Sequence, residues 1–434
     1  MMKQLKKIVV KSGIACALLL SQTAESDLWA MSSEEDPDRK LLLELPDIQH
    51  FPQHTEPNKE KDKIDSVFKP KLRFGALLHT YAVVQQDGYN DLHAAAPKAW
   101  SKGFAIHRAR VLLSGALSPR GSFFIETELP STIGTINSDG TKNVKVSQIL
   151  LDAQYQYIFA NSFQLIAGKQ LVSNNRNGLQ AAGSLLTGDF SPSQYRYNMF
   201  EDSPLQGDFG RDLGVNVRGF LFQDRLEYRI GAFTGRMLDG KDPLRYVGRV
   251  AFNFLEKDPD YYYTGTSLGS RKLLTWGVGF DTQSNYQNYS SDVFFDYPLG
   301  YQGAISLNAA FQYMTGGTSN GKYSFATSIP QQTVQFVELG YYFKQIRLQP
   351  WIKYERIEVS AKSEQTGGVL PTDFNKQQSG SLFGAGLNYF FNGLGTNLRL
   401  SYLAKSNYLQ DAQTQVLHKQ TYGQCMLQLQ FSIL

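Results

Sequence analysis

Segments in which apolar residues alternate with polar or small ones recur from Lys69 onward along the sequence. Alternation with a period of two places successive side chains on opposite faces of a β-strand. In RDLGVNVRGFL (residues 211–221), the Leu and Val side chains fall on one face, and Asp212, Asn216 and Arg218 on the other. A helix would not sort the residues in this way, so the pattern predicts an all-β fold.

Sixteen segments show this alternation, and each is expected to form one strand. They span residues 70–84, 104–118, 121–130, 146–158, 162–170, 211–222, 225–235, 244–254, 273–282, 290–298, 302–314, 333–343, 346–355, 379–391, 395–405 and 422–434. A membrane-spanning strand needs about 9 to 11 residues, whereas soluble strands average about 5 to 6. The segment lengths therefore favour a transmembrane barrel over a soluble jelly roll or propeller, in which an ordinary core would cause the same alternation.

The links between these segments alternate between short and long. Short links include SPRG at 118–121, FANS at 159–162 and KQ at 344–345. Outer-membrane barrels have short periplasmic turns and long external loops. We therefore expect residues 69–434 to form a transmembrane antiparallel β-barrel of about 16 strands. Residues 255–272 are too long for a periplasmic turn, so either this turn is elaborated or two strands are hidden in it.

The first residues have the pattern of a secretory signal peptide. Four Lys residues precede an apolar stretch from Ile14 to Leu20, which is too short for a membrane-spanning helix. We expect residues 1–30 to be the signal peptide, with cleavage near residue 24 or 30. Residues 31–68 carry ten acidic and five basic residues without periodicity, which predicts a flexible, charged periplasmic extension. Residues 69–434 then carry a formal net charge of +7.

Five stretches of the sequence resemble a known family in their order and spacing. They are FAIHRARVLLSGALSP (104–119), LDAQYQYIF (151–159), GRDLGVNVRGFL (210–221), LEYRIGAFTGR (226–236) and YVGRVAFNF (246–254). Together they resemble the phosphate-selective porin O and P family, and the first stretch is similar to the arginine-rich second strand of that family. The resemblance implies a sixteen-stranded outer-membrane porin, usually a homotrimer, whose lumenal Arg and Lys side chains select anions such as phosphate.

Basic residues on the polar faces of the expected strands are candidates for the pore lining. They are Arg73, Arg108, Arg110, Arg218, Arg229, Arg245, Arg249, Arg347, Lys353 and Arg399. A charge that faces lipid costs about 2 to 4 kcal/mol at mid-bilayer, so these side chains are expected to face the lumen. A guanidinium group meets two phosphate oxygens at once, and rings of such groups favour anions in a pore.

Acidic residues on the same faces leave a second interpretation open. They are Glu126, Glu128, Asp212, Glu227 and Glu355. If they pair with the basic residues, the charges neutralise one another and the pairs only stiffen the wall.

The longest link, residues 171–210, follows the fifth expected strand and is therefore the third external loop. In general sixteen-stranded porins the third loop folds inward and narrows the channel, and the resemblance implies the same here. Its candidate constriction residues, with those at the adjoining strand ends, are Lys169, Arg176, Arg196 and Arg211. The loop also contains Asp189, Glu201, Asp202 and Asp208, so its charge is mixed.

The expected function is passive diffusion of small anions, such as phosphate or polyphosphate, through a channel in the bacterial outer membrane. A general or carbohydrate porin, with Tyr195, Tyr197 and Tyr261–Tyr263 as a stacking track, is one alternative. A barrel that only anchors surface loops is another. The six His residues are scattered and no catalytic motif, cofactor motif or metal-ligand cluster is present, so we expect no enzyme. The basic residues form no patch that would bind nucleic acid, so the expected partners are small anions and outer-membrane lipids.

Overall fold

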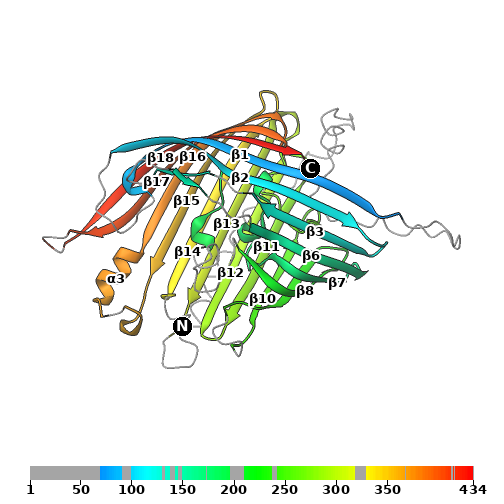
Figure 1. Cartoon of the computed structure of the whole chain (residues 1–434), viewed down its shortest axis with the longest axis horizontal. Coiled ribbons are helices and arrows are strands. Elements are labelled where there is room, and N and C mark those ends of the chain that lie inside the picture. The colour runs from blue at the N-terminus through cyan, green and yellow to red at the C-terminus, as the bar shows by residue number, and fades with distance from the viewer. Residues whose placement is uncertain are drawn as a thin grey trace, which may run out of the picture. The chain divides into compact units, whose positions relative to one another are not determined.

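Sixteen antiparallel strands form a closed barrel in the computed structural model (Figure 1). The structure describes residues 69–89, 99–129, 132–136, 142–144, 149–172, 174–195, 210–236, 242–317, 329–366, 368–411, 414 and 416–433. Each strand pairs with its neighbours in chain order, and β1 closes the barrel by pairing with β18. Closure satisfies the backbone hydrogen bonds of every strand and leaves no open sheet edge, as a barrel in lipid requires.

The barrel strands have the following bounds. They are β1 (Lys71–Gln86), β2 (Trp100–Ala116), β3 (Gly121–Glu128), β6 (Ile149–Ala160), β7 (Phe163–Leu171), β8 (Arg211–Leu221), β9 (Leu226–Phe233), β10 (Arg245–Asn253), β11 (Leu273–Gln283), β12 (Tyr286–Pro298), β13 (Gly303–Thr315), β14 (Gln332–Phe343), β15 (Leu348–Val359), β16 (Gly380–Asn392), β17 (Thr396–Gln410) and β18 (Leu417–Ile433).

Each of the sixteen segments expected from the sequence corresponds to one barrel strand. The largest differences are at the strand ends, where β17 continues to Gln410 and β18 begins at Leu417. The two-stranded sheet of β4 (Thr132–Ile136) and β5 (Lys142–Val144) was not expected. Nor was helix α3 (Pro371–Gln378), whose Pro371 at the first helical position fits a helix start. Both additions lie in long links, which have no alternating pattern.

The outward and inward faces of the barrel have opposite character. Outward side chains are apolar and exposed, for example Phe104 at 82%, Leu213 at 58% and Ile352 at 52%. Inward side chains such as Arg245 and Gln428 are polar and fully buried. This arrangement is the inverse of a soluble protein, and it suits a wall between lipid and a polar interior. Among the described residues, no helix is both long and apolar enough to cross a membrane.

We call the two ends of the barrel the short-turn end and the long-loop end, after the links that the strands carry there. Residues 117–120, 222–225 and 344–347 are examples of short turns. Residues 254–272, between β10 and β11, lie at the same end but form an elaborated turn without an additional barrel strand. The alternative of two hidden strands was therefore wrong. The predicted signal peptide and periplasmic extension, residues 1–68, lie outside the described residues.

Candidate functional site: two loops inside the barrel

Two links fold into the interior of the barrel from opposite ends. The first, between β7 and β8, is named loop L3 and is described at residue 172 and over residues 174–195. The second is named the inner segment and comprises residues 254–272. Loop L3 is fixed to the wall close to its start, because Asn174 donates to the carbonyl of Asn288 on β12 (3.2 Å). The candidate site is the part of the lumen that these two links fill.

Loop L3 crosses the lumen and binds to the opposite wall. Arg399 on β17 donates to the carbonyl oxygens of Leu185 (3.0 Å) and Thr187 (3.2 Å). Asn388 on β16 donates to the carbonyl of Leu186 (2.8 Å). These contacts supply hydrogen bonds to the carbonyls of residues 185–187, which buried backbone groups need.

Asp189 of loop L3 returns to the wall at β2, where it binds two consecutive side chains. Arg108 donates to one carboxylate oxygen, and His107 Nε2 lies 3.1 Å from the other. Consecutive residues of a regular strand point to opposite faces, but the register between β1 and β2 shifts at this point. The shift is a β-bulge, which lets His107 and Arg108 reach the same acceptor. Burial raises the pKa of Asp189, but the charges of Arg108 and His107 outweigh it and hold that pKa well below its usual value.

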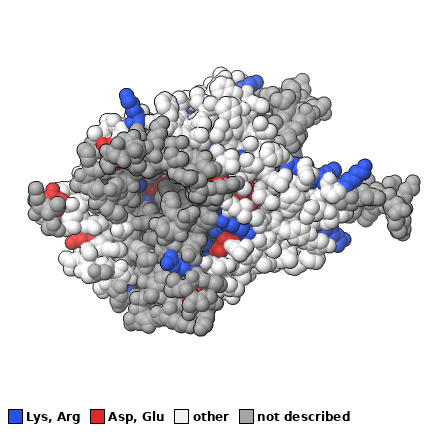
Figure 2. Space-filling view, in the orientation of Figure 1, with Lys and Arg blue, Asp and Glu red and all other residues white. Residues whose placement is uncertain are grey.

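Most of the predicted pore-lining basic residues are bound to carboxylates. The ion pairs are Arg110 with Glu126 and Glu128, Arg211 with Glu126 and Asp152, Arg218 and Arg229 with Glu227, Arg245 with Asp212 and Asp281, Arg249 with Asp292, and Lys353 with Glu355. In the part of the chain that the structure describes, ten Lys and Arg residues are buried against thirteen Asp and Glu residues. Figure 2 shows basic and acidic side chains side by side near the middle of the view. Nine of these ten buried bases therefore have a carboxylate partner, and the buried acids outnumber the buried bases.

Three of the predicted site residues do not take the positions expected of them, and a fourth is not described. Arg73 is exposed near the start of β1. Arg347 lies in the turn before β15, not in the strand, and donates to the carbonyl of Phe391. Lys169 pairs in register with Leu213, whose side chain faces outward, so Lys169 lies on the outward face of β7. Arg196 lies outside the described residues.

Arg176 of loop L3 is completely buried inside the barrel. Its Nη2 atom donates to Asp258 of the inner segment (2.7 Å) and to the carbonyl of Thr264 (3.0 Å). Its guanidinium also lies over the rings of Tyr263 (4.4 Å to the ring centre) and Phe294 (3.8 Å). The residue connects loop L3, the inner segment and β12, and its charge is shielded by these partners.

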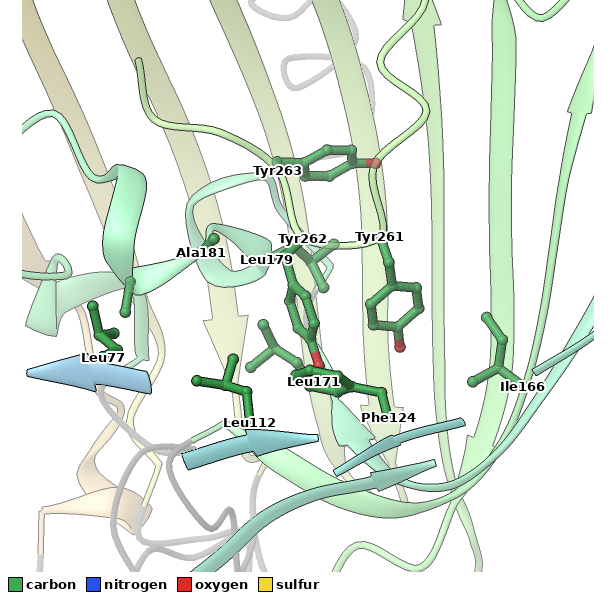
Figure 3. Packing of buried hydrophobic residues seen from close by; sticks show 11 residues of the cluster. Leu77, Leu112, Phe124, Ile166, Leu171, Leu179, Ala181, Tyr261, Tyr262 and Tyr263 are labelled. Carbon is green, nitrogen blue, oxygen red and sulfur yellow. The ribbon is translucent and has the colours of Figure 1, made fainter. Parts of the chain in front are cut away.

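Three consecutive tyrosines of the inner segment pack into a hydrophobic cluster inside the barrel (Figure 3). Tyr261 donates to Gln170 (2.9 Å), Tyr262 to Asp152 (2.9 Å) and Tyr263 to Glu227 (2.6 Å). Burial raises the pKa of each tyrosine, to about 12 for Tyr261, so all three hydroxyls keep their protons and donate. Since the rings are at most 7% exposed, they do not form the stacking track of the carbohydrate-porin alternative.

The inward faces of β13–β18 carry amide side chains more often than charges. The buried amides are Asn308, Gln312, Gln332, Gln349, Asn388, Asn397, Asn407, Gln428 and Gln430. Four charged residues are buried on these strands, namely Glu338, Lys353, Glu355 and Arg399. We call this side the amide wall, and we call the inward faces of β2, β3, β6 and β8–β12 the ion-pair wall.

Sequence reasoning missed the residues that attach loop L3 to the wall. His79 and His107 were regarded as scattered, but pairing of β1 with β2 brings His79 Nδ1 to 3.2 Å from Arg108, and His107, next to Arg108 on β2, binds the same Asp189. The inward position of His79 in its strand was the available signal, because a polar residue on a buried face needs a partner. In the described part of the chain, no His, Cys, Asp and Glu residues form a group that could hold a metal ion.

Comparisons with known proteins identify the fold. The chain is similar to OprB of Pseudomonas putida (11% identity, TM-score 0.53), over 83% of this chain and 94% of that chain. It is also similar to the outer membrane channel DcaP of Acinetobacter baumannii (12%, 0.51, 83% and 97%) and to Salmonella typhi OmpF (13%, 0.50, 83% and 97%). The fold is that of an outer-membrane porin. Together with the apolar outward face, this fold places the barrel in the bacterial outer membrane. No family model and no curated protein matches the chain, so the resemblance to the phosphate-selective family lacks this support.

Proposed function

We propose that the protein is a diffusion channel that admits small polar solutes through the outer membrane with little selection by charge. The observation that supports this function best is the polar interior of a lipid-facing barrel, crossed by loop L3 and compensated in charge. A selective ion channel needs charged groups that remain available to the ion. Here the guanidinium groups of the ion-pair wall already bind carboxylates.

The experiment for this function is reconstitution of the purified protein. Planar bilayers are expected to show stepwise conductance, and liposomes are expected to swell in small neutral sugars but not in larger ones, since loop L3 narrows the passage. Liposomes made without protein are the control. If neither conductance nor swelling occurs, the proposal is wrong and a barrel that anchors surface loops becomes the better description.

A preference for small anions such as phosphate is the second candidate, and Arg399 favours it. This buried guanidinium donates to the carbonyl oxygens of Leu185 and Thr187 and to the side-chain amide oxygen of Asn397 (2.7 Å). Neutral dipoles therefore balance its positive charge. An anion that passes loop L3 would meet an attractive field there. Phosphate added to one side of a bilayer is expected to reduce the chloride current under this candidate, and Arg399→Gln is expected to abolish the effect.

The homotrimer that the resemblance implies stays a prediction. Light scattering of the protein in mild detergent, corrected for the bound detergent, measures the number of chains per particle. A mass of three chains would support the trimer, and a mass of one chain would contradict it.

A further inference from the structure

The inner segment and loop L3 meet inside the barrel and are joined there by a single parallel β-bridge. Gln180 of loop L3 forms a bridge with Tyr263 of the inner segment. The amide of Ala181 donates to the carbonyl of Tyr263 (2.9 Å), and the amide of Tyr263 donates to the carbonyl of Leu179 (2.8 Å). Figure 3 shows Leu179 and Ala181 beside the three tyrosines. The backbones of two links from opposite ends of the barrel are thus directly hydrogen-bonded.

The contact continues two residues further along the inner segment. The amides of Gly265 (3.2 Å) and Thr266 (3.1 Å) both donate to the carbonyl of Ser184 in loop L3. A Cβ atom on Gly265 would lie 2.8 Å from the Ser184 carbonyl oxygen and 2.9 Å from Leu185 Cα. Backbone atoms cannot yield as a flexible side chain does, so a larger residue at this position has to separate the two links.

The inner segment is itself fixed to the wall on the side of β12–β16. Thr266 Oγ1 lies 3.0 Å from Ser306 Oγ and accepts from Gln349 (3.2 Å). The amide of Ser267 donates to Asp296 (2.6 Å). Leu268 packs in a cluster with Ala304, Tyr342 and Phe390. A segment with these attachments provides a rigid support for the part of loop L3 that crosses the lumen.

We propose that the inner segment positions loop L3 and so sets the width of the passage from the short-turn end, an inference that rests on the porin function. The residues of the crossing, Gly183–Thr187, bind the inner segment on one side and Arg399 and Asn388 on the other. Gly265 is the positioning residue of this contact. The width of the passage is therefore set by links from both ends of the barrel, namely loop L3 from the long-loop end and the inner segment from the short-turn end.

The test is Gly265→Val, with Gly103→Val as the matched control because a Cβ on Gly103 meets no atom within 4 Å. Gly265→Val is expected to raise the single-channel conductance and to broaden its distribution, while Gly103→Val conducts as the wild type does. Gly265→Ala, a smaller wedge, replaces Gly265→Val if the larger variant does not fold. Equal conductance of wild type, Gly265 variant and control would overturn the inference.

Hydrogen exchange gives a second readout that does not depend on conduction. The amide of Ala181 and the amide of Tyr263 are expected to exchange faster in the Gly265 variant than in wild type, since their shared hydrogen bonds are lost. Unchanged exchange would contradict the inference even if conductance changed. A wild-type protein without channels would instead refute the porin function, and the exchange experiment alone would then decide whether the inner segment positions loop L3.

Discussion

The ion-pair wall and the amide wall enclose the same lumen but hold the loops by different interactions. On the ion-pair wall, guanidinium groups bind carboxylates of neighbouring strands and then reach loop carbonyls, as Arg218 does with Glu227 and Asp260. On the amide wall, Asn388 binds loop L3 without a charged partner. Burial of an ion pair costs desolvation energy that only good geometry repays. The comparison teaches that the arginines of this barrel serve first to hold the structure together. The number of arginines in the sequence therefore does not predict the electrostatic potential in the lumen.

Removal of a shared carboxylate is expected to have the largest effect. Glu227 accepts from Arg218 (2.6 Å), Arg229 (2.7 Å) and Tyr263 (2.6 Å), and all three partners are buried. Glu227→Gln leaves two buried guanidinium groups without an acid, which is expected to lower the free energy of unfolding by about 3 to 5 kcal/mol. Urea unfolding in detergent, followed by the mobility of the folded barrel on gels, measures the loss.

Glu358→Gln is the matched control for that substitution. Glu358 pairs with Arg356 at 3.5 Å, and about half of each side chain is exposed (56% and 49%). An exposed pair contributes about 0 to 1 kcal/mol, so the control is expected to unfold like the wild type. Equal losses in the two variants would contradict the distinction between a structural ion-pair wall and the rest of the barrel.

Release of loop L3 at the amide wall is expected to change conductance more than stability. Arg399→Gln removes the donors to Leu185 and Thr187, and we expect a higher single-channel conductance because the crossing is no longer fixed at that side. Arg347→Gln is the control, since Arg347 also binds a backbone carbonyl, that of Phe391 (3.2 Å), but at an exposed short turn. If the two variants have the same conductance, the contacts of Arg399 do not hold loop L3 across the lumen.

Loss of a neutral amide side chain is expected to be smaller than loss of the shared carboxylate. Asn388→Ala removes the hydrogen bond to loop L3 together with those to Gln349 and from Trp351. The free energy of unfolding should fall by about 1 to 3 kcal/mol, below the loss for Glu227→Gln. A loss as large as that of Glu227→Gln would remove the contrast between the two walls.

The smallest expected effect is that of pH on conductance. Because the pKa of Asp189 is held below its usual value, its contact with Arg108 stabilises the loop fully above the unfolded pKa of 3.8 and is lost as the pH falls through the lower, folded pKa. Conductance is therefore expected to stay constant between pH 7 and about pH 4.5. A step in conductance within this range, absent in Asp189→Asn, would show that the carboxylate titrates in place and that the contact is weaker than the geometry indicates.

The sequence predicted the barrel well because alternation with a period of two is a local signal. RDLGVNVRGFL became β8, and the sixteen-strand count followed from repeating the same test. The inward face was predictable too, as Arg218 and Arg249 illustrate, since lipid excludes charge. What the sequence did not contain was the pairing across strands. Arg211 meets Glu126 from a strand that is distant in sequence, and no local pattern encodes that contact.

The inner segment was visible only as an anomaly. Its length identified residues 255–272 as unusual, but its tyrosines were considered as a stacking track, and the fold instead placed Tyr263 against loop L3. Arg347 was misplaced because the expected strand began two residues too early, and Leu348 is the first residue of β15. Boundaries of this kind depend on the turn, here with a positive φ of 55° at Arg347, which alternation does not describe.

The zero-current potential of the wild-type protein in a planar bilayer under a KCl gradient tests the central claim most directly. If the buried basic residues are compensated by carboxylates, the potential stays close to zero, and Arg110→Gln together with Glu126→Gln leaves it there. A large potential of anion-selective sign, lost when Arg110 is replaced, would show that the charge of the buried basic residues acts on the permeating ions. That result would contradict the account.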